Sequence, residues 1–151
     1  MEWFDRLVDS PHVEQALLAS SDGRVLRARR IISGDSERAA AMLQSADVLA
    51  QELSSALGCG AAAMVQISTH REHIIIMPLL NATYYLAVQV ARTAPLLLFM
   101  IELERALAAM RPGDFARAEE SQGAGDDTPV LDAAELIAAV REWLRGRSTL
   151  R

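Results

Sequence analysis

Apolar and polar residues follow helical spacing in some parts of the chain and extended spacing in others. Helical spacing covers residues 2–8, and Pro11 ends it because proline pushes the preceding residue out of the helical region. Two extended segments follow at residues 15–20 and 24–30. Residues 21–23 between them are Ser-Asp-Gly, a sequence that tolerates the positive φ of tight turns. The pattern predicts a short helix followed by a β-hairpin.

A long amphipathic helix is predicted after the hairpin. Asp35 or Ser36 can cap its start, and Gly58 stops it after about Leu57. Within it, apolar residues recur at spacings of three and four and form one stripe. The stripe comprises Ala39, Met42, Leu43, Ala46, Leu49, Ala50, Leu53, Ala56 and Leu57. We expect this stripe to face the core.

A second face of the same helix carries mostly small and polar residues. It contains Ala41, Ser45, Val48 and Glu52. Val48 is an apolar, β-branched residue among polar neighbours, so it is either an isolated surface residue or part of a contact with a helix of a second chain. The sequence leaves both interpretations open.

Three strands are predicted next, at residues 61–69, 73–80 and 83–92, and a helix follows from Pro95 to about Met110. The turns between the strands are short, which makes neighbouring strands antiparallel. The middle strand is apolar at odd and even positions alike, so both faces of the sheet must be covered. The expected architecture is an α+β, three-layer sandwich with the long helix on one face and the two flanking helices on the other.

The rest of the chain differs in composition. Residues 1–111 form the predicted domain, and residues 112–128 are rich in glycine, proline and acidic side chains, which indicates a flexible linker. Residues 129–151 contain an amphipathic helix with Trp143 near the margin of its apolar side. This appended helix needs a groove on its own domain, on a neighbouring subunit or on another protein.

Charge and composition exclude several classes of function. The net charge of −5 and the pI near 5.2 weigh against nucleic acid and anionic membranes as partners. The fifteen basic residues are all arginine, so a phosphate-binding loop with lysine and a Schiff-base enzyme are excluded. A single cysteine, no apolar run of membrane-spanning length and no signal-like N-terminus predict a cytoplasmic protein.

Candidate chemical groups are few. His70, Glu72 and His73 could bind a metal if the turn folded them inward, but a solvated turn is the simpler interpretation. Cys59 follows a helix end whose dipole disfavours the thiolate, so it is interpreted as a small packing residue. No serine has the surroundings of a hydrolase nucleophile. We therefore expect no catalytic residue, no cofactor and no metal.

The order of the elements resembles the Roadblock family, which includes dynein light chains and prokaryotic regulators of small GTPases. Residues 16–26 and 61–90 carry the resemblance, which covers roughly residues 2–110. It implies a five-stranded antiparallel sheet of order 2-1-5-4-3. It also implies that the arginine-rich second strand and the third strand lie at opposite edges of this sheet.

The two edges differ in charge. Residues 58–69 carry no charge, and an uncharged free edge invites another strand. The resemblance implies a homodimer that joins these edges into a ten-stranded sheet and places the two long helices side by side. The expected interface comprises Ala61, Ala63, Val65 and Ile67 of the strand with Ala41, Ser45, Val48 and Glu52 of the helix.

By the same resemblance, the protein is expected to be a non-catalytic module that binds and regulates or scaffolds a small Ras-like GTPase. Residues that could dock a partner are Arg24, Arg27, Arg29 and Trp143, although a solvated edge is the simpler interpretation of the arginines. The alternative is a ligand-sensing domain or a heteromeric adaptor domain of a signalling complex.

Overall fold

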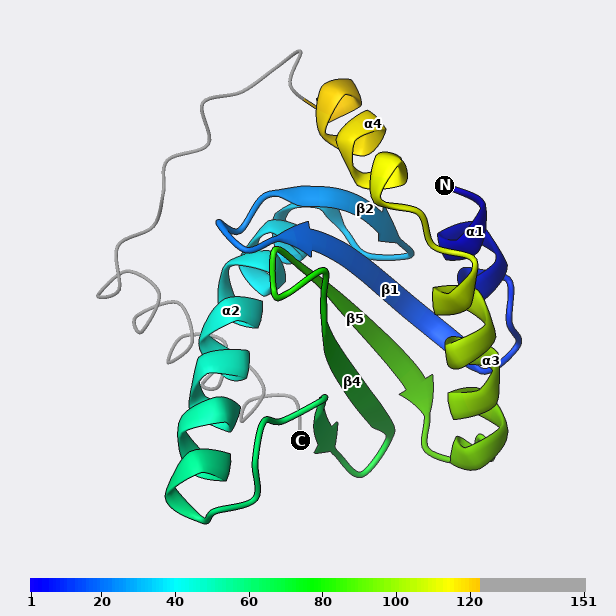
Figure 1. Ribbon diagram of the computed structural model, residues 1–151. Coiled ribbons are helices and arrows are strands. Elements are labelled where there is room, and N and C mark those ends of the chain that lie inside the picture. Colours follow the sequence, from blue (N-terminus) through cyan, green and yellow to red (C-terminus); the bar gives the residue numbers. More distant parts are fainter. Residues whose placement is uncertain (123–151) are drawn as a thin grey trace.

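The computed structural model describes residues 1–122 of the 151-residue chain (Figure 1). The predicted helix at 129–151, the end of the predicted linker and Trp143 lie outside the described residues. The elements are α1 (Glu2–Val8), β1 (Val13–Ser20), β2 (Val25–Arg29), α2 (Ser33–Ala56), β3 (Val65–Ser68), β4 (Glu72–Leu79), β5 (Tyr84–Ala91), α3 (Leu96–Ala108) and α4 (Pro112–Gln122).

The strands form one antiparallel sheet in the order β2-β1-β5-β4-β3, as predicted (Figure 1). One face of the sheet packs against α2 through a cluster of Leu17, Ala19, Ala40, Leu43, Ile76 and Tyr85. The opposite face packs against α1, α3 and α4, with Phe99 and Leu103 among its buried side chains. The predicted α+β, three-layer sandwich is confirmed, with one more helix on the second face than the sequence suggested.

The prediction of a linker that begins at residue 112 is wrong, because residues 112–122 form α4. Phe115 is buried and stacks on Tyr84 with ring centroids 4.4 Å apart, and it also lies 6.0 Å from the ring of Trp3. Ala118, one helical turn further, is buried beside it. Phe115 and Ala118 thus form the apolar side by which this otherwise polar helix packs against the domain.

The third strand is shorter than predicted, since it begins at Val65 rather than at residue 61. Continuing the register of β3 and β4 would place Ala63 opposite Pro78. Pro78 has no N–H to donate to the ladder at that position. In addition, the side-chain amide of Gln51 holds the backbone of Ala62 against α2. The pairing of β3 with β4 therefore begins at Val65, opposite Ile76, and does not reach Pro78.

The buried face of α2 also differs from the predicted one. Leu49 and Leu53 are 67% and 58% exposed, whereas the line toward the sheet contains Leu43 and the polar Asp47. Asp47 is buried because it accepts a hydrogen bond from the Tyr85 hydroxyl on the sheet. The predicted stripe is thus only partly correct, because Leu43, Ala39 and Ala46 pack against the core. Its leucines nearer the C-terminal end, Leu49, Leu53 and Leu57, do not.

Candidate functional site

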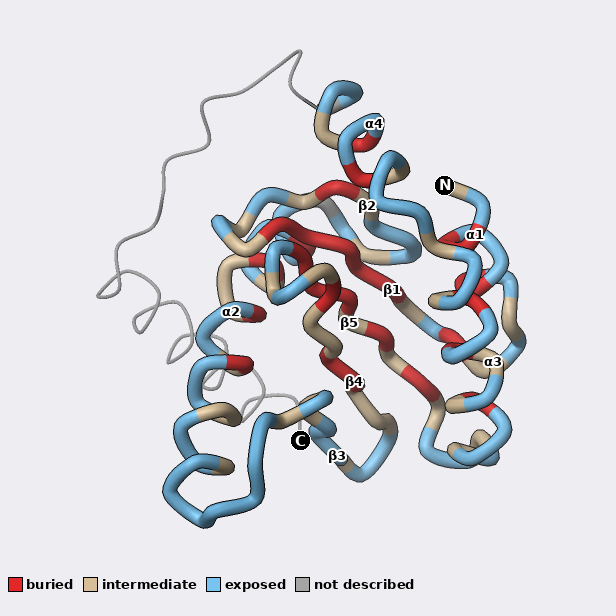
Figure 2. Tube along the Cα trace, in the orientation of Figure 1, coloured by how far each residue is buried: buried red, intermediate tan, exposed pale blue. Residues whose placement is uncertain are grey.

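The uncharged edge strand β3 and the exposed side of α2 form the candidate site. Among residues 1–122, β3 pairs with β4 and with no other strand, and Val65 and Ile67 lie opposite Ile76 and Ile74. Because Ile76 and Ile74 belong to the cluster beneath α2, both β3 side chains lie on the α2 face of the sheet. Ile67 is 43% exposed. Figure 2 shows that exposed residues dominate the last turns of α2, the loop after it and β3.

Three exposed leucines define what we call the leucine stripe: Leu49 and Leu53 of α2 and Leu57, the residue that caps the C-terminal end of this helix. The sequence interpretation missed them as surface residues because it placed them in the core. Helix length was a signal that part of α2 extends beyond the sheet, but it does not identify which side of the helix is exposed. The 24 residues of α2 span about 36 Å, whereas five strands span about 19 Å, so the helix is longer than the sheet is wide.

The predicted interface residues are not all brought together. Ser45, Val48 and Glu52 are exposed on α2, but Ala41 is half-buried beside the β1–β2 turn. A Cβ atom built on Gly23 of that turn would lie 3.4 Å from the Cα of Ala41. By helical spacing these four residues share one side of α2, and the leucine stripe lies on the neighbouring side.

The predicted strand residues divide in a similar way. Val65 and Ile67 belong to β3, whereas Ala61 and Ala63 precede it and are exposed. Only the first pair therefore lies in the edge strand itself.

A buried polar network connects the sheet, α2 and the segment before β3. The Tyr85 hydroxyl donates to Asp47 at 3.1 Å, and the Gln51 amide donates to the other oxygen of Asp47 at 3.1 Å. Gln51 also donates to the carbonyl of Ala62 and accepts from its N–H, both at 2.9 Å. Burial, together with the bond and charge of Asp47, raises the pKa of Tyr85 to about 12. The network fixes the path of the chain into β3.

The arginines predicted to dock a partner are largely engaged within the chain. Arg24 lies 3.2 Å from Asp22 and 3.8 Å from Glu119 of α4, and Arg29 lies 3.7 Å from Asp9. Arg27 is half-buried on β2. A hydrogen bond from the hydroxyl of Ser20 lowers the pKa of Asp22, and Arg24 adds to this effect. This group holds the hairpin and α4 together.

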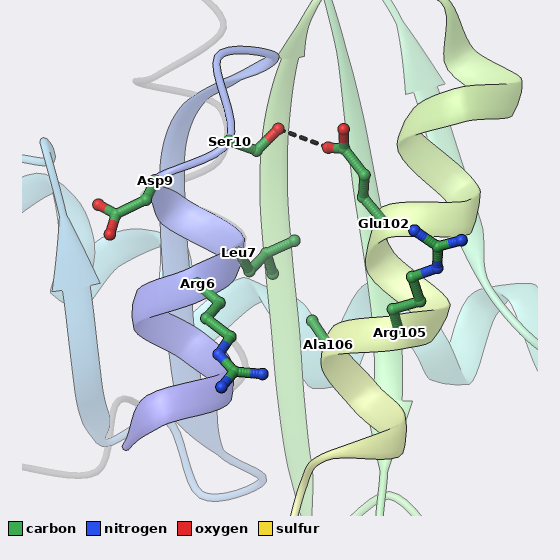
Figure 3. Close-up of a pocket in the computed structure, with 7 residues that line it drawn as sticks. All are labelled: Arg6, Leu7, Asp9, Ser10, Glu102, Arg105 and Ala106. Carbon is green, nitrogen blue, oxygen red and sulfur yellow. Dashed lines mark hydrogen bonds between the residues drawn. The ribbon is translucent and has the colours of Figure 1, made fainter.

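A groove of about 480 Å³ lies between α1 and α3 (Figure 3). Arg6 and Asp9 line it from the α1 side, and Glu102 and Arg105 line it from α3. The Ser10 hydroxyl donates to Glu102 at 2.5 Å. Opposite charges lie on both walls, so the groove has no single charge preference.

The candidate metal ligands do not converge. The Ser68 hydroxyl and Nδ1 of His73 are 2.9 Å apart, and His70 is exposed in the turn. Within residues 1–122, no three histidine, cysteine, aspartate or glutamate side chains are grouped so that they could hold an ion. Cys59 is exposed and free. Across the same residues, no helix has both the length and the apolar character needed to cross a membrane.

Comparison with solved structures places this fold among known ones. A Roadblock/LC7 domain from Streptomyces avermitilis is 21% identical, with a TM-score of 0.66 over 76% of this chain and 98% of its own. MglB of Myxococcus xanthus is 13% identical, with a TM-score of 0.62 over 70% and 85%. The gliding protein MglB of Thermus thermophilus is 18% identical, with a TM-score of 0.58 over 70% and 80%. At these identities the likeness concerns the fold alone.

The comparison of sequences gives the family. No curated protein matches the chain. The sequence profile of the Roadblock/LC7 domain, however, matches residues 2–90, which is more than half of the chain and includes α1, α2, β1 to β4 and all of β5 except Ala91. Members of this family are generally non-catalytic adaptors or regulators, consistent with an interaction module. The chain belongs to the Roadblock/LC7 family.

Proposed function

We propose that the chain is a homodimeric interaction module that binds and regulates or scaffolds a small Ras-like GTPase. The observation that carries this proposal is the exposed leucine stripe on α2 beside an uncharged free edge strand. The dimer provides the surface, and the GTPase is the partner that the family resemblance implies.

The homodimer is supported by the unfavourable free energy of leaving the leucine stripe and the edge of β3 exposed to water. Leu49, Leu53 and Leu57 are 58–69% exposed, and exposed leucines gathered on one helix are typical of a contact surface. The edge of β3 carries no charged side chain, bulge or proline that would discourage pairing. By contrast, the β2 edge carries arginines and an irregular register. A twofold dimer buries the same patch on both subunits.

The GTPase is supported by family membership and by the likeness of the fold to MglB proteins. In this proposal the GTPase binds a surface that exists only when two subunits are paired. Such a partner favours one nucleotide-dependent conformer of the GTPase by binding it more tightly than the other.

The solution mass of the full chain by light scattering tests the dimer. We expect twice the monomer mass of 16.5 kDa, and a shift toward the monomer in Leu53→Glu. Gln44→Glu is the matched control, because Gln44 is exposed on the same helix and belongs neither to the leucine stripe nor to the predicted interface residues. A monomeric wild-type chain contradicts the dimer and favours the heteromeric adaptor.

A binding assay with purified small GTPases loaded with GDP or with a non-hydrolysable GTP analogue tests the partner. We expect one GTPase to bind with a preference for one nucleotide, and Leu53→Glu to weaken that binding. A stable dimer that binds none of the GTPases encoded in the same genome contradicts this part of the proposal.

A further inference from the structure

The free edge of β3 presents the backbone groups of two residues. The Thr69 N–H donates to the Glu72 carbonyl at 2.9 Å, so the backbone groups of Thr69 face β4. Backbone groups alternate between the two sides of an antiparallel strand. Ile67 therefore also faces β4, and the N–H and C=O groups of Gln66 and Ser68 point away from the sheet.

An independent hydrogen bond gives the same alternation. The Arg92 N–H donates to the Arg71 carbonyl at 3.1 Å, in register with the pairing of β4 and β5. The backbone groups of Arg71 thus face β5, and those of the next residue, Glu72, face β3. This agrees with the Thr69–Glu72 bond.

The side chains of β3 limit how the strand can pair with a second copy. Residues directly opposite one another in an antiparallel pair point to the same face of the sheet. Val65 and Ile67 lie on the α2 face, so Gln66 and Ser68 lie on the other face. If the twofold axis fell between two consecutive residues, each residue would lie opposite one whose side chain points to the other face of the sheet. The axis must therefore pass through a residue.

The axis can pass through only one residue if Gln66 and Ser68 are both to form backbone hydrogen bonds with residues of the partner's β3. An axis at Ile67 places Gln66 opposite the partner subunit's Ser68 and the reverse, which gives four backbone hydrogen bonds. An axis at Gln66 would use Met64, which lies outside β3, and an axis at Ser68 would use His70 in the turn. The shortness of β3 thus selects the register.

We propose that two copies of the chain pair their β3 strands antiparallel with Ile67 at the twofold axis, in contact with the partner subunit's Ile67. This register rests on the homodimer proposed above. The two isoleucines form a pair without hydrogen bonds, in which Cα atoms approach to about 4.5 Å. Their contact removes the 43% exposure of Ile67 on the face that α2 occupies. Gln66 and Ser68 keep their polar side chains on the other face.

Cysteine crosslinking tests the register in the full chain. Cys59 is exposed and is first replaced by serine, so that each variant has a single thiol. Ile67→Cys places two thiols across the axis at a Cα separation that a disulfide can bridge. Gln66→Cys is the matched control on the same exposed strand. In this register its two Cα atoms are about 8 Å apart, beyond the reach of a disulfide.

After mild oxidation, we expect a covalent dimer in most of the Ile67→Cys chain and in little of the Gln66→Cys chain. The reverse result places the axis at Gln66 and overturns the proposed register. If neither variant forms a crosslink while the solution mass still indicates a dimer, the dimer uses another surface. That result also overturns the proposed register. If the unmodified chain has the mass of a monomer, the homodimer itself is contradicted, and the register that depends on it is contradicted too.

Discussion

The hydroxyl of Tyr85, in the middle of the sheet, donates a hydrogen bond of 3.1 Å to Asp47, a carboxylate that is only 6% exposed on α2. Its neighbour Tyr84 points to the opposite face and donates to Glu119 of α4 at 3.0 Å. Two consecutive tyrosines thus each connect the sheet to a helix on a different layer.

Tyr85→Phe is expected to lower the free energy of unfolding by about 1–3 kcal/mol, because it removes one donor from a buried carboxylate. Tyr84→Phe is the matched control. Its partner Glu119 is half-exposed and can bond to water, so we expect about 1 kcal/mol or less. Urea unfolding measured for both variants at neutral pH compares them. Equal losses would contradict the difference in burial.

The pKa of Tyr85, raised to about 12, predicts a loss of stability at alkaline pH. The ordinary value is 10.0, so the neutral form is favoured by folding. This contribution is complete below pH 10 and is lost as the pH rises through about 12. The chain has only two tyrosines, so absorbance of the phenolate in Tyr84→Phe reports Tyr85 alone. A midpoint near 10 would contradict the effect of Asp47.

Gln51→Ala is expected to release the segment before β3. The substitution removes both hydrogen bonds to Ala62 and one donor to Asp47, which we expect to cost about 1–3 kcal/mol. Hydrogen exchange of the Ala62 amide should become faster than in the wild type. Gln44→Ala, at an exposed position of α2, should leave this exchange unchanged. Equal exchange in both variants would show that Gln51 does not anchor the segment.

Phe115→Ala is expected to detach α4 from the sheet. Phenylalanine to alanine in a core costs about 3–5 kcal/mol, and here it also removes the stacking on Tyr84. Arg117→Ala, on the exposed side of the same helix, should cost about 0.5 kcal/mol or less. Urea unfolding followed by the fluorescence of the tryptophans, of which Trp3 contacts Phe115, compares the two variants. Similar losses would show that α4 contributes little to the domain.

The sequence was sufficient for elements whose pattern and neighbours agree. Residues 2–8 have helical spacing and form α1 at those bounds, and short turns made β3, β4 and β5 antiparallel. It failed where one residue in a distant element decides the outcome. Pro78 shortens β3, and Tyr85 draws Asp47 into the buried line of α2 in place of the leucines. Neither effect is visible in the local pattern.

The sequence predicted some residues of the candidate site and not others. Composition showed that residues 58–69 carry no charge, and the family resemblance implied that this strand lies at an edge of the sheet. Val65 and Ile67 lie in the strand that the structure shows there. The helix residues of the site were assigned from a periodicity that cannot distinguish a stripe that faces the sheet from one that faces a second chain. Leu49 and Leu53 were therefore missed, although they are the largest apolar groups on that side of α2.

The position of α4 over β2 determines where the rest of the chain leaves the domain. β2 is the edge opposite β3, so pairing through β3 would carry the two α4 helices to the outer ends of the joined sheet. Nine strand spacings separate those ends by roughly 40 Å. In such a dimer the two Gln122 residues, where the described part of each chain ends, would lie on opposite flanks of the assembly and away from the twofold axis.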